Sequence, residues 1–242
     1  MRGLGRFYQV QVTCRGEADP TTGYCLNIHA IDEAVRRHVL PYLNGLIAGD
    51  LSGGDAPLGR VMRRMLELLT PALAQRVARL RLDLTPYLNL TIRSDDMAHV
   101  TLRHEYEFAA AHRLHVASMS DEANRATFGK CNNPSGHGHN YRLEVAARVP
   151  IDPAGRVMTA ERLDAIVDSH VVEKLDHKHL NVDVPQFAGL NPSVENIAKV
   201  IYDMLRPPLA AAGAELEEVR VWETSKTACT YRGEDGGVAA LG

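Results

Sequence analysis

Residues 137–149 read HGHNYRLEVAARV, and apolar side chains occupy every second position from Tyr141 to Val149. This period-two alternation is typical of a strand with one face in a core. Polar residues such as Arg142 and Glu144 stand between the apolar ones. The stretch therefore predicts a half-buried strand that opens with two histidines, His137 and His139.

The segments after this strand predict a turn, two helices and another strand. Asp152–Gly155 supplies the turn, and residues 163–175 carry apolar side chains at helical spacing. Asn191 and Pro192 are expected to begin the second helix, as its N-cap and its first residue. A last strand is expected from about Val219 to Glu223. This order of strands and helices indicates an α+β unit.

The first half of the chain repeats this order of elements. It has an alternating strand, a turn, two segments of helical period and a closing strand, at residues 8–12, 19–23, 31–39, 61–69 and 88–92. The two endings also align, with Arg93 where the second half has Glu223. We therefore expect tandem α+β units, residues 1–103 and residues 104–242.

The composition argues against several classes of protein. The net charge of the 242 residues is -3, and no cluster of Lys and Arg is interleaved with aromatic residues, so nucleic acid is not expected as a partner. No apolar run approaches membrane-spanning length, and the first residues lack the apolar core of a secretory signal. We expect a cytoplasmic protein with no membrane partner. Its four cysteines are too scattered for a disulfide framework.

Three histidines predict a metal site. His137 and His139 share one face of their strand, and His112 ends the alternating run of residues 106–110. If those two strands pair antiparallel, the three imidazoles converge and leave one coordination position open, as in catalytic zinc sites. The cluster has no cysteine or carboxylate at a fourth position, which disfavours a closed structural site. The alternative is that these are ordinary polar or core histidines.

Cys131 and the neighbouring residues Asp176 and His177 are candidates for proton transfer. Cys131 lies in the polar, glycine-rich run 129–140, where a nearby cation and a metal would make its thiol more acidic. Asp176 could orient the imidazole of His177. The alternatives are a small buried thiol, the role expected of Cys14, Cys25 and Cys229, and a solvated histidine at a helix end.

Glu223 shares a strand face with Val219 and Val221, where a carboxylate needs a partner unless the strand end is exposed. A carboxylate that accepts two parallel N–H bonds suits the cyclic guanidine edge of a pterin or guanine ring. Glu223 is therefore a candidate for substrate binding.

Five motifs, in this order, resemble the 6-pyruvoyl-tetrahydropterin synthases. They are FAAAHRL at 108–114, CNNPSGHGHN at 131–140, Asp176-His177, SVEN at 193–196 and WET at 222–224. The resemblance covers about residues 104–233, and residues 1–100 resemble only a degenerate copy of the same unit. It implies the tunnelling fold (T-fold), in which antiparallel four-stranded sheets with two helices on one face close into a barrel on oligomerisation.

The resemblance also implies roles for individual residues. His112, His137 and His139 would be the zinc ligands. Cys131 would be the general base, with Asp176 and His177 as its proton relay. Glu223 would bind the pterin, assisted by Glu195. The implied reaction is conversion of 7,8-dihydroneopterin triphosphate to 6-pyruvoyl-tetrahydropterin with loss of triphosphate. Because the side chain of the substrate rearranges by internal redox, zinc is the only cofactor expected.

Other functions remain open at this point. The related 6-carboxytetrahydropterin synthases of deazapurine (queuosine) biosynthesis act on the same substrate and release acetaldehyde and triphosphate. The five residues between Cys131 and His137 resemble the pyruvoyl branch more closely. A non-catalytic T-fold binding protein would not need Cys131, and a generic zinc hydrolase would leave both Cys131 and Glu223 unexplained.

The first half departs from the family pattern. It has no His-x-His, no counterpart of Cys131 and no counterpart of Asp176 and His177. We expect a non-catalytic unit that helps to close the barrel of a homo-oligomer. Six units in two stacked rings of three would make a trimer of this chain, and one ring of four units would make a dimer.

Overall fold

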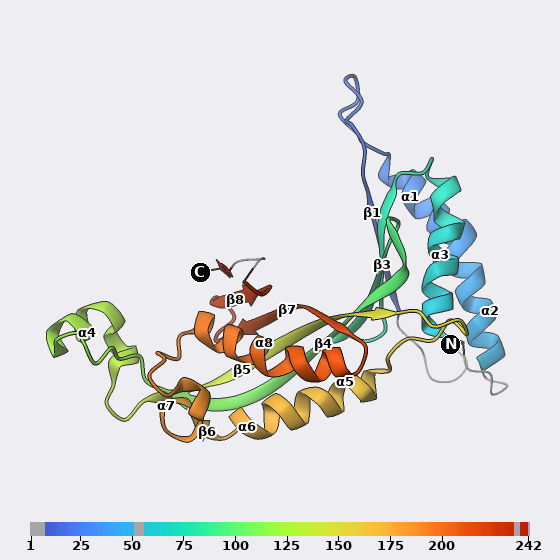
Figure 1. The fold of residues 1–242 in the computed structure, drawn as a ribbon. Helices are drawn as coiled ribbons and strands as arrows, with labels where there is room; N and C mark the ends of the chain where they lie inside the picture. Colours follow the sequence, from blue (N-terminus) through green and yellow to red (C-terminus); the bar gives the residue numbers. More distant parts are fainter. Residues whose placement is uncertain (1–7, 51–55, 235–237, 242) are drawn as a thin grey trace. The chain divides into compact units, whose positions relative to one another are not determined.

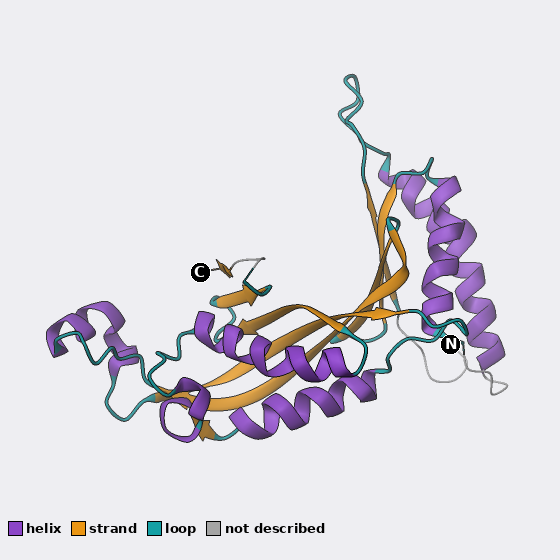
Figure 2. Ribbon diagram, viewed as in Figure 1, coloured by secondary structure: helices purple, strands orange, loops and turns teal. Residues whose placement is uncertain are grey.

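The computed structural model of the protein describes residues 8–50, 56–234 and 238–241 (Figures 1 and 2). These residues form two compact units. The first comprises residues 1–103 with 148–158, and the second comprises residues 104–147 with 159–242. Strands β4 (Asp96–His112) and β5 (His137–Pro150) each contribute residues to both units.

The sheet of the first unit has the strand order β1-β2-β3-β4. Its other strands are β1 (Gln9–Cys14), β2 (Val77–Asp83) and β3 (Leu88–Arg93), and both β1–β2 and β2–β3 pair antiparallel. Residues 77–83 were not predicted as a strand. Alternation is present there, but charged residues take the polar positions and hide the short apolar pattern.

Helices cover one face of this sheet. They are α1 (Ile28–Ala34), the π-helical turn η1 (Val35–Val39), α2 (Leu40–Asp50) and α3 (Leu58–Ala72). Helix α3 packs on β2 and β3 and buries Met62, Met65 and Leu69. Leu80 and Ile92, paired across β2 and β3, are fully buried beneath the helices. Apolar burial of this kind is the main stabilising contribution to the unit.

At alternate positions of β1, β3 and, from Arg79 onward, β2, the side chains are polar. The antiparallel register puts these positions opposite one another, so a second sheet face is built from Gln9, Gln11, Thr13, Arg79, Arg81, Asp83, Asn89, Thr91 and Arg93. On this face the carboxylate of Asp83 accepts hydrogen bonds from the side chains of Gln11 and Arg81. The first unit therefore has one apolar sheet face and one polar sheet face.

The sheet of the second unit has the strand order β4-β5-β7-β8-β9. It adds β7 (Glu215–Trp222), β8 (Ala228–Tyr231) and β9 (Val238–Leu241), which pair antiparallel in sequence. The two-residue strand β6 (Lys178–His179) pairs parallel with β4. The prediction of an antiparallel sheet with helices is confirmed.

The helices of the second unit comprise two long elements and several short ones. The long elements are the run α5 (Ala160–Val167), η3 (Asp168–Val172) and α6 (Glu173–Leu175), and helix α8 (Val194–Ala211), which packs on β7 and β8. The short elements are α4 (Asp121–Phe128), η2 (Gly129–Asn132), α7 (Leu180–Asp183) and η4 (Pro185–Phe187). Within the described ranges, no helix is long and apolar enough to cross a membrane.

The start of α8 corrects one prediction. Its N-cap is Ser193, whose hydroxyl accepts the N–H of Asn196, and not Asn191. The side chain of Asn191 instead accepts the backbone N–H of His115, and the carbonyl of Pro192 accepts a hydrogen bond from His112. Contacts with the segment around His112 therefore take both residues out of the helix.

Candidate metal centre and active site

The three predicted histidines come together at one end of the β4–β5 pair. His112 is the last residue of β4, and His137 and His139 open β5, its neighbour in the sheet. The Nε2 atoms of His112 and His137 are 3.1 Å apart, and the possible ligand atoms of all three rings lie within 4.8 Å of one another. The strand pairing thus produces the cluster that the spacing predicts.

The protonation of these rings suits a cation. The buried His112 donates its Nδ1 proton to the carbonyl of Pro192 at 2.7 Å, which leaves the Nε2 lone pair directed into the cluster. Burial lowers the pKa of His112 to about 4, although the bond to Pro192 acts in the opposite direction. Burial also lowers the pKa of His137, and the neighbouring ring of His139 lowers it further. Neutral imidazoles are the form that binds metals.

Two buried nitrogen atoms of the cluster have no hydrogen-bond partner within the described part of the chain. They are Nδ1 of His137 and Nε2 of His139. An unpaired polar atom in a buried position is costly unless something satisfies it. A metal ion bound by the three rings would satisfy His139, so the donor set fits a metal centre.

The turn before His137 depends on a glycine. Gly136 has a φ of +73°, and its N–H donates to the carbonyl of Asn133 at 2.8 Å. A Cβ at this position would lie 2.7 Å from Nε2 of His179 and 3.0 Å from the carbonyl oxygen of His112. Only glycine therefore gives the conformation and the close approach that put His137 beside His112.

The carboxylate of Glu223 lies beside the histidines. Glu223 follows the last residue of β7, with 18% of its side chain exposed. Its Oε1 is 3.4 Å from Nε2 of His112 and 3.8 Å from Nε2 of His139. The position of β7 next to β5 in the sheet brings this carboxylate beside the histidines, while the group of possible ligands that lie together contains only the three rings.

Cys131 lies in η2, half-buried, and its carbonyl accepts the N–H of Leu114 at 2.8 Å. Burial raises the pKa of its thiol, and the negative charge of Glu223 raises it further. The sequence around Cys131 predicted a more acidic thiol. The protein groups around Cys131 act in the opposite direction, so acidity there would have to come from a bound cation.

Asp176 and His177 form a hydrogen-bonded pair beside β4. Asp176 Oδ2 is 2.7 Å from Nδ1 of His177, and Asp176 Oδ1 accepts the N–H of Ala109 at 2.7 Å. The Ala109 bond and then the His177 bond lower the pKa of Asp176. His177 has a φ of +56°, and 84% of its side chain is exposed.

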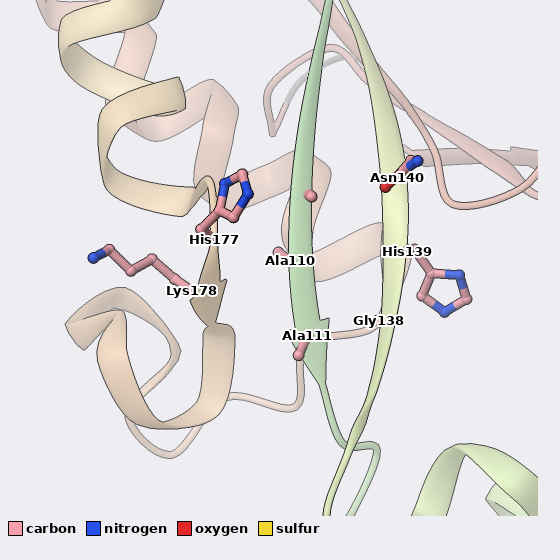
Figure 3. Close-up of a pocket in the computed structure, with 8 residues that line it drawn as sticks. Ala110, Ala111, Gly138, His139, Asn140, His177 and Lys178 are labelled. Carbon is pink, nitrogen blue, oxygen red and sulfur yellow. The ribbon is translucent and has the colours of Figure 1, made fainter.

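The structure does not join this pair to Cys131 by any hydrogen bond among the described residues. In Figure 3 the strands β4 and β5 separate His177 from His139. His177 and Lys178 instead line an open recess of about 610 Å³, together with Ala109, Ala110, Ala111, Gly138, His139 and Asn140. His177 and the ring of His139 therefore lie on opposite sides of β4 and β5 in this view.

The remaining candidates differ in their surroundings. Glu195 lies in the first turn of α8. Burial and then the negative charge of Glu195 raise the pKa of the Cys229 thiol to about 11. Cys229 is fully buried, as expected. Cys14 and Cys25 are partly exposed, so the expectation that they are buried is wrong.

His179 is a residue of the site that sequence reasoning missed. Its Nε2 lies against Gly136, and its positive form would lower the pKa of His112. Its buried Nδ1 has no partner among the described residues. A strand of two residues has no readable alternation, so no local signal indicates that His179 lies beside the metal cluster.

Known proteins resemble the second unit. The sequence profile described as 6-pyruvoyl tetrahydropterin synthase matches residues 101–234. Proteins named 6-pyruvoyl tetrahydrobiopterin synthase from Poecilia reticulata and Homo sapiens are 45% and 44% identical over 128 residues, which cover 52% of this chain and 86% and 87% of those proteins. The structure of Caenorhabditis elegans 6-pyruvoyl tetrahydropterin synthase matches with a TM-score of 0.52 and 38% identity, over 56% of this chain and 96% of that one.

Proposed function

Because this chain belongs to the 6-pyruvoyl tetrahydropterin synthase family, we propose that it converts 7,8-dihydroneopterin triphosphate to 6-pyruvoyl-tetrahydropterin with loss of triphosphate. One observation carries the proposal within the structure. His112, His137 and His139 converge with a carboxylate, Glu223, beside them, all within the segment that matches the family. The enzyme is a lyase that acts on a phosphorylated pterin.

The metal in this proposal is zinc, held by His112, His137 and His139. Three neutral nitrogen ligands with space for a further ligand are the donor set of catalytic zinc sites. A zinc ion bound there would polarise the side-chain hydroxyls of the substrate and oppose the charge of Glu223 near Cys131. His112 is held in its metal-binding tautomer by Pro192.

Glu223 would anchor the pterin ring through its cyclic guanidine edge, and Glu195 would assist from the start of α8. The proximity of Glu223 to the histidines allows a second role, that of a fourth metal ligand. The variant Glu223→Gln distinguishes the role of pterin anchor from that of metal ligand. A pterin anchor predicts full zinc content and a KM raised at least about tenfold, because one of two charge-assisted bonds becomes weak. Loss of zinc would assign Glu223 as a ligand.

Cys131 would remove a proton from the side chain of the substrate, and Asp176 with His177 would relay it. The side chain of His177 is 84% exposed, and no hydrogen bond among the described residues joins the pair to Cys131, so in this proposal the pair of a second copy completes the relay. Asp176 orients the His177 ring through Nδ1, which leaves Nε2 free to exchange a proton.

The assembly proposed is a homo-oligomer with a closed barrel, in which residues 1–103 form a degenerate, non-catalytic T-fold unit and residues 104–242 the catalytic one. The polar sheet face of the first unit suits a wet barrel interior, and a closed barrel removes edge strands. A π-helical turn also follows α1 in the first unit, as η1, and α5 in the second unit, as η3, which supports the repeat. A trimer of this chain would contain six units, and a dimer would contain four. We assign the protein to the cytoplasm on its composition.

The test is incubation of the zinc-loaded protein with 7,8-dihydroneopterin triphosphate, followed by identification of the products. We expect triphosphate and the pyruvoyl pterin, and no turnover in His137→Ala/His139→Ala. Acetaldehyde among the products would instead assign the chain to the 6-carboxytetrahydropterin synthases. A protein that retains zinc and releases no triphosphate would contradict an enzymatic role.

A further inference from the structure

Residues 113–116 follow the metal-cluster residue His112 and belong to no helix or strand. All four of their backbone N–H groups nevertheless have partners in the protein. Each of the four N–H groups donates a hydrogen bond at 2.8–3.0 Å, three of them to asparagine side chains and the one of Leu114 to the carbonyl of Cys131. Backbone without regular structure normally turns to water for such bonds.

The partners are four asparagines from four parts of the second unit, named here the asparagine clamp: Asn124 of α4, Asn132 of η2, Asn181 of α7 and Asn191, which precedes α8. Asn181 bonds both the N–H and the carbonyl of Arg113, and Asn124 bonds both groups of Val116. Asn132 donates to the carbonyl of Leu114, and Asn191 accepts from His115.

The hydrogen-bonding groups of the asparagine side chain explain why this residue type recurs in the clamp. Its side-chain amide carries one acceptor and two donor hydrogens, so it can pair with a peptide group as a neighbouring strand would. Asn124 is fully buried, and 7% of Asn132 is exposed, so neither side chain has water as an easy replacement partner. Hydrogen bonds made by buried side chains that cannot exchange them for water favour one conformation. The clamp therefore holds residues 113–116 rigid without a sheet.

Asn132 links this segment to Cys131, its neighbour in η2. The side-chain Nδ2 of Asn132 donates to the carbonyl of Leu114 at 2.7 Å, and the N–H of Leu114 donates to the carbonyl of Cys131 at 2.8 Å. The guanidinium of Arg113 donates from Nε to the carbonyl of Asn132 at 3.2 Å. Three hydrogen bonds thus join the two residues after His112 to the two residues at Cys131 and Asn132.

We propose that Asn132 is a positioning residue, which fixes Cys131 relative to the metal cluster by tying η2 to the segment that continues from His112. The inference rests on the proposed role of Cys131 as general base. A proton-transfer group must lie within hydrogen-bond reach of its target, and a displacement of about 1 Å can lower the rate about 100-fold. The clamp supplies this precision through residues that touch neither metal nor substrate.

The decisive variant is Asn132→Asp, which keeps the shape of the side chain and replaces its donor with a carboxylate oxygen that the carbonyl of Leu114 repels. We expect kcat to fall about 10- to 100-fold, with KM within about threefold of the parent value and zinc content unchanged. Hydrogen exchange of the amides of residues 113–116, followed by mass spectrometry without substrate, should accelerate at least about tenfold.

Two further variants serve as a control and as a replacement. Asn89→Asp, in the first unit, changes another buried asparagine and should lower Tm while kcat stays at the parent value. Asn132→Ser removes the amide without adding charge and replaces Asn132→Asp if that variant does not fold.

Parent kcat in a folded Asn132 variant would overturn the proposal, and so would unchanged hydrogen exchange of residues 113–116. A parent protein that is inactive on the pterin triphosphate would overturn the proposed function instead. The exchange measurement would still show whether Asn132 holds the segment.

Discussion

Gly136 is the position where one added methyl group should disturb the site most clearly. The change Gly136→Ala adds a Cβ to a residue with a φ of +73°, between the ring of His179 and the backbone of His112. The His179 ring can rotate away to some extent. The carbonyl of His112 cannot move without moving a residue of the metal cluster.

The magnitude follows from two contributions. A left-handed conformation costs an L-residue about 1–2 kcal/mol, and forcing a methyl group into filled space costs about 1–3 kcal/mol more. The matched control is Gly213→Ala, which has a φ of +78° and no atom within 4 Å of the added Cβ. We expect Gly213→Ala to lower the free energy of unfolding by about 1–2 kcal/mol and Gly136→Ala by about 2–5 kcal/mol.

The assay is urea unfolding of both variants and the parent, after removal of metal by a chelator and again with added zinc. Gly136→Ala should also weaken zinc binding at least about tenfold, as displaced supporting groups do at metal sites, whereas Gly213→Ala should bind zinc as the parent does. Equal losses of stability in the two variants, with equal zinc affinity, would refute the argument that the methyl group meets the metal cluster.

Four other expectations concern the metal, the base, pH and assembly. Purified protein should hold about one zinc ion per chain, because only one group of three possible ligands occurs among the described residues, and full zinc occupancy in His137→Ala/His139→Ala would exclude these ligands. Cys131→Ala should keep zinc and lose most turnover, in contrast to Cys25→Ala in the first unit, and parent activity in Cys131→Ala would refute the general-base assignment. Hydrogen bonds from His99 and then Arg148 lower the pKa of Asp96 to about 2, so its contribution to stability is present above about pH 4 and lost as the pH falls through about 2. The difference in unfolding free energy between the parent and Asp96→Asn should therefore shrink across that range, and a constant difference would contradict it. Mass measurement in solution should find three chains, or two, per particle, and a fully active monomer would show that no second copy completes the site.

The sequence by itself was sufficient for features that depend on neighbouring residues. The alternation in residues 137–149 predicted β5, and because successive side chains of a strand point to opposite faces, it also put His137 and His139 on one face. The adjacency of Asp176 and His177 made them a candidate pair, and the hydrogen bond between them forms in the structure. In each case the geometry of a single strand or of consecutive residues determines the result.

The tertiary structure decided features that depend on contacts between distant segments. The proximity of Glu223 to His112 arises from the neighbouring positions of β5 and β7 in the sheet, and the place of His179 from the pairing of β6 with β4. Ser193 became the N-cap of α8 because the side chain of Asn191 accepts a hydrogen bond from the N–H of His115, 76 residues earlier. The pKa of Cys131 rises because the fold buries its thiol and brings a carboxylate near it. Sequence spacing gives the direction of a side chain along its own element, but burial and charge depend on what the rest of the chain packs around it.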